Sequence, residues 1–158
     1  SVIDNAETAQ RNLADCLEEA GRATALLSIT PAGALLTASR AGELHFTRNF
    51  DISTQSLAAS PEARRDQFDR LVLELQRTVD VLEHQYSFLS VSALWLSPFA
   101  HAEELLSLLI ENLYLPVKLI DLEQVFDTRR CPLPAEPDRQ AALFHALGLA
   151  LRGLEVAA

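Results

Sequence analysis

The stretch SPEARRDQFDRLVLELQRTVDVLEHQY, residues 60–86, predicts the longest helix of the chain. Ser60 is a good N-cap, because its hydroxyl can accept a hydrogen bond from an amide of the first turn. Pro61 follows at the helical position that best tolerates proline. Such a helix, on the order of 40 Å long, must pack against something broad and apolar, and a β-sheet is the natural candidate. The apolar residues that form its inner stripe recur at steps of three and four: Phe68, Leu71, Val72, Leu75, Val79, Leu82 and Tyr86.

The segment before this helix predicts one helix and three strands. Residues 4–20 have helical spacing, with Asp4 or Asn5 as the cap and Gly21 as the terminator. We expect their inward stripe to contain Ala6, Ala9, Leu13, Cys16, Leu17 and Ala20.

Three short runs then predict an antiparallel meander, because turn residues separate them. The third run alternates, and this places Leu44, Phe46 and Arg48 on one face and Glu43, His45, Thr47 and Asn49 on the other. The runs are residues 23–29, 34–39 and 43–50.

After the long helix, strand-like and helix-like segments alternate. Residues 88–97 are typical of a strand covered on both faces, residues 100–113 of a helix and residues 116–122 of another strand. Residues 127–137 predict an exposed loop and residues 139–153 a last helix. In that helix we expect Leu143, Phe144, Leu147 and Leu151 to face inward, Gly148 to allow close contact with the sheet, and Gly153 to end the helix.

The order of these elements predicts an α/β fold of the ribonuclease H-like kind. Its mixed five-stranded sheet would contain the three-strand meander, and helices would flank it. Nothing in the pattern requires a second domain, so residues 1–158 are expected to form one. The chain does not begin with methionine, and we therefore expect it to belong to a longer protein.

Composition and charge exclude several function classes. A net charge of −9 argues against a general surface for nucleic acid or anionic membranes, since both need basic residues. No apolar run is long enough for a membrane-spanning helix, and there is no signal-peptide pattern. Cys16 and Cys131 are isolated, which favours reduced thiols, although a disulfide between them stays open.

A metal-dependent nuclease of this fold would need acidic residues on its first and fourth strands. Those strands offer Ser28 and Ser97, and only Glu74 of the long helix could match. We therefore expect no catalytic residues and no metal site. The histidines lack metal-ligand spacing and are interpreted as solvated or capping residues: His45, His84, His101 and His145.

A nucleotide-binding protein of this fold would need glycine-rich turns after the same two strands, because glycine lets backbone amides approach a phosphate. The first turn here contains Pro31, which lacks an amide donor, and has no acidic residue; the second has no glycine. We expect no bound cofactor and only vestigial phosphate and adenine turns, at Ser28, Thr30, Gly33, Ser97 and Pro98.

Three segments together resemble the actin-like proteins of type IV pilus assembly, of the PilM type. They are RAGELHFTRNFDIS, LVLELQRTVDVLEHQYS and ALFHALGLALRGL. The opening ETAQRNLADCLEEAGRATALLSI is most similar to the MshI-like biogenesis proteins of the mannose-sensitive haemagglutinin (MSHA) pilus. The matching positions are Gly42, Leu44, Phe46, Thr47 and Arg48; Glu74, Gln76, Arg77, Thr78 and Asp80; and residues 147–152.

The resemblance implies half of an actin-like fold, with the N-terminal half lying before residue 1. It also implies a cytoplasmic scaffold, peripheral to the bacterial inner membrane, that binds the cytoplasmic tail of a single-pass pilus assembly protein. It implies no nucleic acid partner and no insertion into the membrane, and it allows a homodimer. Two alternatives stay open: an actin-like ATP-binding protein whose site needs the other half, and an unrelated ribonuclease H-like domain.

Overall fold

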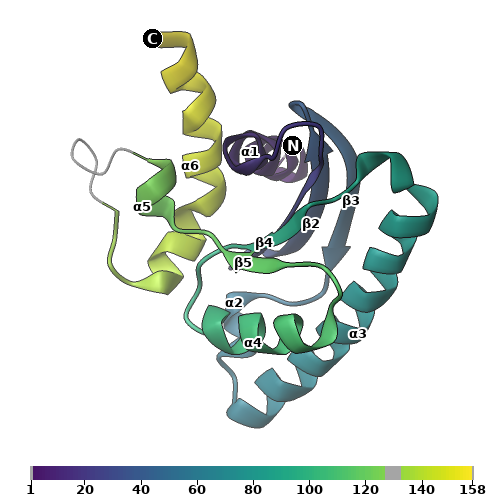
Figure 1. Cartoon of the computed structure of the whole chain (residues 1–158). Coiled ribbons are helices and arrows are strands. Elements are labelled where there is room, and N and C mark those ends of the chain that lie inside the picture. Colours follow the sequence, from purple (N-terminus) through teal and green to yellow (C-terminus); the bar gives the residue numbers. More distant parts are fainter. Residues whose placement is uncertain (1, 127–132, 158) are drawn as a thin grey trace.

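Strand β1 (Thr24–Thr30) is the centre of the molecule, and all of its residues are buried. The computed structural model describes residues 2–126 and 133–157. Its single sheet has the order β3-β2-β1-β4-β5, and β1 pairs antiparallel with β2 and parallel with β4. The predicted mixed five-stranded sheet with its meander is therefore confirmed (Figure 1). The other strands are β2 (Gly33–Arg40), β3 (Glu43–Phe50), β4 (Ala93–Leu96) and β5 (Val117–Leu119).

Helices α3 (Pro61–Gln85) and α4 (Ala102–Asn112) cover one face of this sheet. As predicted, the Ser60 hydroxyl caps α3, accepting from the amide of Ala63 at 3.1 Å. The predicted inner stripe is buried, most of it against alternate residues of β1 and Leu82 against Ala23, Ala38 and Leu89. Tyr86, the C-cap of the helix, is half-buried. The short α2 (Thr54–Leu57) leads into α3 and adds Leu57 to the same core.

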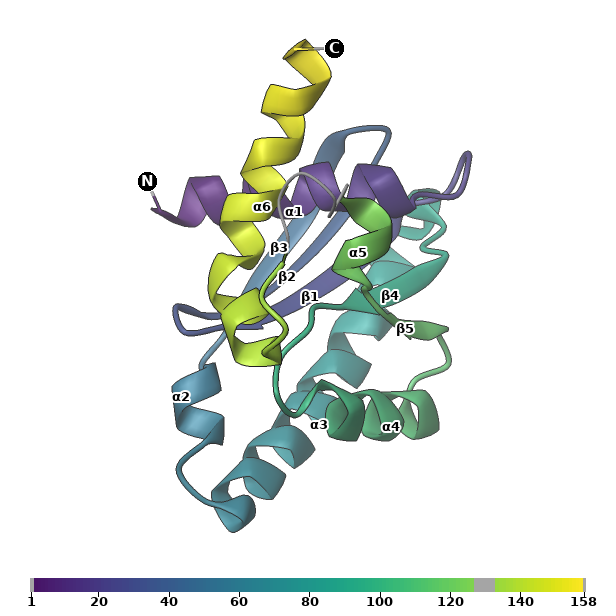
Figure 2. The same ribbon diagram turned by 90° about the vertical axis from the view of Figure 1, so that its left-hand side faces the viewer.

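Helices α1 (Val2–Leu17) and α6 (Pro137–Ala157) cover the opposite face, together with the short α5 (Leu122–Val125). Figure 2 shows these helices in front of the sheet and α3 and α4 below it. Because side chains of a strand alternate, β1 sends Leu27 to the α3 side and Leu26 to the α1 side. The result is a three-layer α/β/α arrangement with an apolar core on each face of the sheet.

A β-bulge interrupts the alternation predicted for β3. The pairing of β2 with β3 shifts by one residue between Ala38 and Ser39, so His45 is the additional residue. The His45 ring contacts Phe88 and the Phe46 ring contacts Tyr86, and those two partner rings are themselves neighbours. The prediction that His45 and Phe46 lie on opposite faces was wrong, since the bulge brings both to one aromatic cluster.

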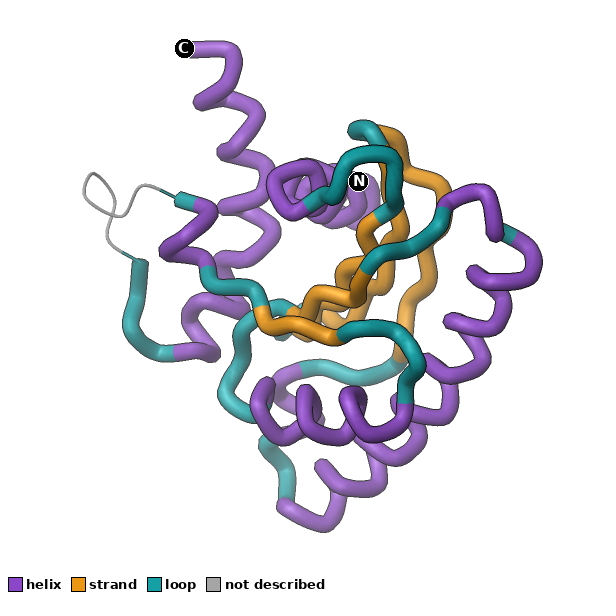
Figure 3. The backbone as a smooth tube through the Cα atoms, in the orientation of Figure 1, coloured by secondary structure: helices purple, strands orange, loops and turns teal. Residues whose placement is uncertain are grey.

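The strand predicted over residues 88–97 is shorter, because its first half is not paired. Ser87–Leu89 form a turn of 3₁₀ helix, η1, and Ser90 has the left-handed φ of +49°. A strand cannot continue through that conformation, so β4 is short (Figure 3). Phe88 remains 56% exposed. Likewise β5 stops early, because Asp121 caps α5 by accepting from the amide of Glu123 at 3.0 Å.

Helix α1 begins earlier and ends earlier than predicted. It starts at Val2, so Asp4 and Asn5 lie within it, and it ends at Leu17, ahead of Gly21. Its buried stripe is Ala9, Gln10, Leu13 and Ala14, whereas Cys16 and Ala20 are exposed. Cys131 and most of the predicted 127–137 loop lie outside the described residues.

Gly148 allows close contact between two helices, and not with the sheet as predicted. A Cβ atom at this position would lie 2.6 Å from the carbonyl oxygen of Ala9 on α1. The side chain of Asn12 also donates to the carbonyl of Gly148 at 3.2 Å. The α6 helix continues to Ala157, so Gly153 does not end it, and Leu143 is 44% exposed and not inward.

Replacing Gly148 by alanine should therefore destabilise the protein, although the same change usually stabilises a helix by about 1 kcal/mol. The new methyl group would overlap the backbone of α1, and we expect a loss of about 1–3 kcal/mol. Urea unfolding measures it, with Ala150→Gly on the exposed side of α6 as the control for helix propensity. A Gly148→Ala variant as stable as the native protein would contradict the close crossing.

Candidate functional site

The two turns predicted to be vestigial lie side by side at the carboxyl ends of β1 and β4. Ser97 joins them, because its hydroxyl accepts from the amide of Ile29 at 3.2 Å and its own amide donates to Leu27 at 2.9 Å. In α/β sheets, ligands commonly bind outside the carboxyl ends of the strands. This edge is therefore the first place to look for a site.

The turn after β1 uses its polar groups internally. The hydroxyl of Thr30 accepts from the amide of Ala32 at 3.2 Å and donates to the carbonyl of Gly33 at 3.4 Å. Pro31 has no amide hydrogen, and Gly33 has a φ of +135°, which favours glycine. The turn consequently offers few of the converging amide donors that a phosphate cradle needs.

The hydroxyl of Ser28 belongs to a buried polar network between β1, α1 and α6. It donates to the side-chain oxygen of Gln10, and His145 Nε2 lies 3.2 Å from Ser28 Oγ and 3.0 Å from Gln10 Oε1. The side-chain nitrogen of Gln10, Nε2, donates to Thr37 Oγ1 and to the backbone carbonyls of Leu26 and Leu35. Ser28 is thus fully engaged in holding α1 and α6 on the sheet.

His145 is the one histidine whose interpretation as a solvated or capping residue was wrong. Burial lowers its pKa from 6.5 to about 4, because the charged ring would lose its hydration. The ring is therefore neutral at physiological pH and acts as a hydrogen-bond partner inside the fold. No spacing in the sequence marks this residue, because its partners Gln10 and Ser28 lie far away in the chain.

Of the other three histidines, His84 is exposed and His45 and His101 are half-buried. The ring of His84 is 2.8 Å from the carbonyl oxygen of Asp80, one turn earlier on α3. His45 packs edge-on against Phe88, and His101 stands at the start of α4. Among the described residues, no group of three His, Cys, Asp or Glu side chains could hold a metal ion.

The turn after β4 is filled by its own side chains. Ser97, Pro98 and Phe99 are all buried, and the Phe99 ring meets Phe68 of α3 edge-on. These side chains occupy the space over the turn, whereas the adenine base of a nucleotide would need exposed backbone on which to lie.

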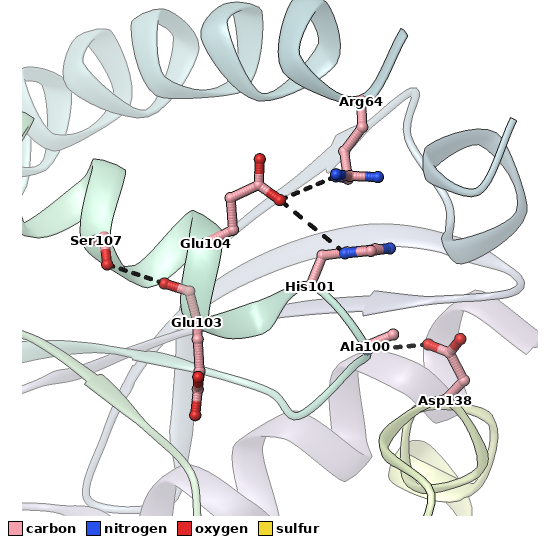
Figure 4. A network of polar contacts seen from close by, with 7 residues as sticks. All are labelled: Arg64, Ala100, His101, Glu103, Glu104, Ser107 and Asp138. Atoms are coloured by element: carbon pink, nitrogen blue, oxygen red, sulfur yellow. Dashed lines mark hydrogen bonds and ion pairs between the residues drawn. The ribbon is translucent and has the colours of Figure 1, made fainter. Parts of the chain in front are cut away.

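Polar contacts fix the next residues of this turn (Figure 4). The amide of Ala100 donates to Asp138 of α6 at 3.0 Å, and Arg64 of α3 pairs with Glu104 of α4 at 2.9 Å. The ring of His101 lies 4.0 Å from the same Glu104 carboxylate. Three helices therefore converge on the turn and hold it in place.

A hollow of about 220 Å³ lies beside the first turn. Its lining residues include Thr30, Gly33, Asn5, Asn49 and His145, and within the part of the chain that the structure describes none of them is lysine or arginine. Since phosphate recognition normally uses a cation, this hollow lacks the charge that a nucleotide would require.

Glu74 cannot complete a metal site with Ser28, because the two residues lie on opposite faces of the sheet. Ser28 faces α1 and α6, whereas Glu74 belongs to α3. Its carboxylate lies 4.0 Å from Arg48 of β3, and Arg48 also donates to Thr78 at 2.6 Å. The fold thus brings the FTR segment of β3 and the ELQRT segment of α3 into contact.

The same segment of α3 also bonds to α4. The side chain of Gln76 donates to the carbonyl of Asn112 at 3.0 Å. The ELQRTVD motif therefore links α3 to the sheet through Thr78 and to α4 through Gln76.

Within the described residues, no helix is long and apolar enough to span a membrane.

Comparisons with known proteins show the fold. No protein-family model matches the chain, and no curated protein sequence matches it. A solved "PilM-PilN type IV pilus biogenesis complex" matches 93% of this chain and 51% of its own, with 22% identity and a TM-score of 0.65. The ethanolamine utilization protein EutJ from Carboxydothermus hydrogenoformans matches 90% of this chain and 53% of its own, with 13% identity and a TM-score of 0.53.

The chain thus spans about half the length of these solved structures. At these identities the likeness shows the fold alone, and the fold is the one predicted: the ribonuclease H-like half of an actin-like fold.

The neutral His145 makes stability depend on pH in a defined window. The unfolded chain binds a proton near pH 6.5 and the folded chain only near pH 4, so stability is complete above about 6.5 and falls as the pH drops toward 4. Between pH 7.5 and 5 this one group should cost about 2 kcal/mol. Urea unfolding at several pH values measures the loss.

A His145→Gln variant keeps a hydrogen-bonding side chain without a titrating ring, and serves as the reference. The difference in stability between the two proteins should shrink as the pH falls through this window. A difference that stays constant from pH 7.5 to 5 would contradict the buried neutral ring.

Proposed function

We propose that this chain is an assembly scaffold of a type IV pilus. The observation that carries the proposal is its likeness, along almost the whole chain, to the solved PilM-PilN complex. That structure is of a pilus biogenesis complex, and the three sequence segments that resemble PilM-type proteins lie on β3, α3 and α6. The MshI-like opening favours a pilus of the MSHA kind.

The partner in this proposal is the cytoplasmic tail of a single-pass inner-membrane pilus component. The protein would accordingly work in the cytoplasm, at the inner face of that membrane, without inserting into it. The net charge of −9 supports a protein partner over nucleic acid or anionic lipid. A homodimer is compatible with this role.

The proposal includes no nucleotide and no catalysis. It is supported by the internal use of the polar groups at both turns: Thr30 bonds its own turn, Ser28 bonds Gln10, and Ser97 bonds Ile29. A ligand phosphate would have to break these contacts, which cost free energy to lose in a buried site.

The direct test of the scaffold role is tail binding. Synthetic peptides covering the cytoplasmic segments of the single-pass membrane proteins encoded beside this gene are titrated into the natural protein by calorimetry. One of them should bind with a Kd of about 1–100 μM, which is typical of short segments that order on binding.

A scrambled peptide of the same composition is the control for charge alone. If none of the encoded tails binds better than its scrambled version, the proposed partner is wrong.

A second candidate function is nucleotide binding, which the actin-like fold itself favours. The hollow beside Thr30 and Gly33 is the candidate nucleotide site of this alternative. A second half-domain could supply the missing cation and the remaining ligands.

We expect calorimetry with ATP and magnesium to show no binding to this chain at up to about 1 mM, because the polar groups of both turns are already bonded within the protein. The same titration with the longer protein to which we expect this chain to belong (the natural protein) distinguishes the two functions. Micromolar binding to this chain would contradict the vestigial turns, whereas binding to the natural protein alone would favour the ATP-binding alternative.

A further inference from the structure

Two hollows adjoin each other along the C-terminal half of α3 and share Val79 and Glu83. They measure about 180 and 200 Å³. The opposite wall consists of the chain just before β4 and the chain just after α4, including Val91 and Leu115. Because the two hollows share lining residues, they form one groove, which we name the α3 groove.

The floor of the α3 groove is apolar. Val79, Leu82 and Leu113 are at most 9% exposed, and Val91 and Leu115 are half-buried. Two adjoining hollows with an apolar floor suit successive side chains of an extended peptide.

Tyr114 stands at the groove and is the most exposed large apolar side chain among the described residues. Its relative exposure is 102%, so the folded chain covers none of the ring. Tyrosine is a common anchor of protein interfaces because it brings a large contact area at a low entropic cost. A partner lying in the groove would cover this ring.

The charge of the groove selects its occupant. Among the described residues, its lining includes the exposed carboxylates of Asp80 and Glu83 and no lysine, arginine or histidine. Arg22 bonds the carbonyls of Ser90 and Val91 in the hollow that Asp80 does not line. A cationic segment is therefore attracted, whereas nucleic acid and anionic lipid are repelled.

The groove is also held at a fixed width. The hydrogen bond from Gln76 to the carbonyl of Asn112 joins its two walls at one end. A groove that already exists in the unbound protein loses little entropy when it is filled, and this favours binding.

We propose that the α3 groove binds a short peptide segment of a partner protein that carries lysine or arginine beside aliphatic residues. The aliphatic side chains enter the hollows over Val79 and Leu115, the cationic ones pair with Asp80 and Glu83, and Tyr114 closes over the segment. The inference goes beyond the proposed pilus role, since it depends on the groove and its charge alone.

Selection of random octapeptides displayed on phage, against the immobilised chain, tests the proposal. The bound pool should become enriched in Lys or Arg next to Leu, Ile or Val. The best peptide, titrated by fluorescence anisotropy, should shift the NMR signals of Val79, Leu115 and Tyr114. A pool without basic enrichment, or shifts elsewhere on the protein, would overturn the inference.

Substitutions at the groove give the quantitative test. Glu83→Lys and Tyr114→Ser should each weaken the binding of the selected peptide at least tenfold. Both side chains are exposed, so the variants should fold. Asp66→Lys is the matched control, because it makes the same charge change on an exposed part of α3 outside the groove. Equal weakening by Asp66→Lys would indicate a general charge effect and contradict the groove.

Sedimentation of the chain alone distinguishes the competing occupant, a second copy of this chain. A dimer that Glu83→Lys dissociates would assign the groove to self-association and overturn the proposed partner segment. Failure of the peptide selection would leave the tail titrations of the pilus proposal unaffected, so the two proposals can fail separately.

Discussion

The structure depends on the burial of β1 on both of its faces. A strand in this position exposes no side chain to water, so helices must cover both sides of the sheet. The helix before the meander and the last helix supply one layer, and the long helix after the meander and its successor supply the other. Removing either layer would leave a wide apolar face in water.

Within that constraint, polar residues in the central strands need partners inside the protein. Gln10 provides most of them on the α1 side, since it bonds β1 through Ser28 and Leu26 and β2 through Thr37 and Leu35. An unpaired buried group costs about 1–3 kcal/mol, so one glutamine stabilises several strand groups at once. The hydroxyl of Thr24 is the one such group without a partner among the described residues.

Local patterns in the sequence were enough to predict most elements of this fold. The capped stripe of α3 and the turns between the strands of the meander are features of neighbouring residues, and both predictions are confirmed. Some errors concern features that distant contacts determine: the close approach of Gly148 to Ala9 and the burial of His145 each depend on a residue far away in the chain. No spacing rule in a single sequence contains that information.

The candidate site shows the same division between local and distant information. The lack of an acidic residue in the first turn and of glycine in the second was visible in the sequence, but the partners of Ser28, Thr30 and Ser97 were not. Those partners show that each of the three hydroxyls stabilises the fold.

A turn that bonds to itself no longer needs a ligand to be stable. An actin-like half-domain of this kind is therefore free to use its outer surfaces, such as the acidic groove along α3, where binding costs no internal contact.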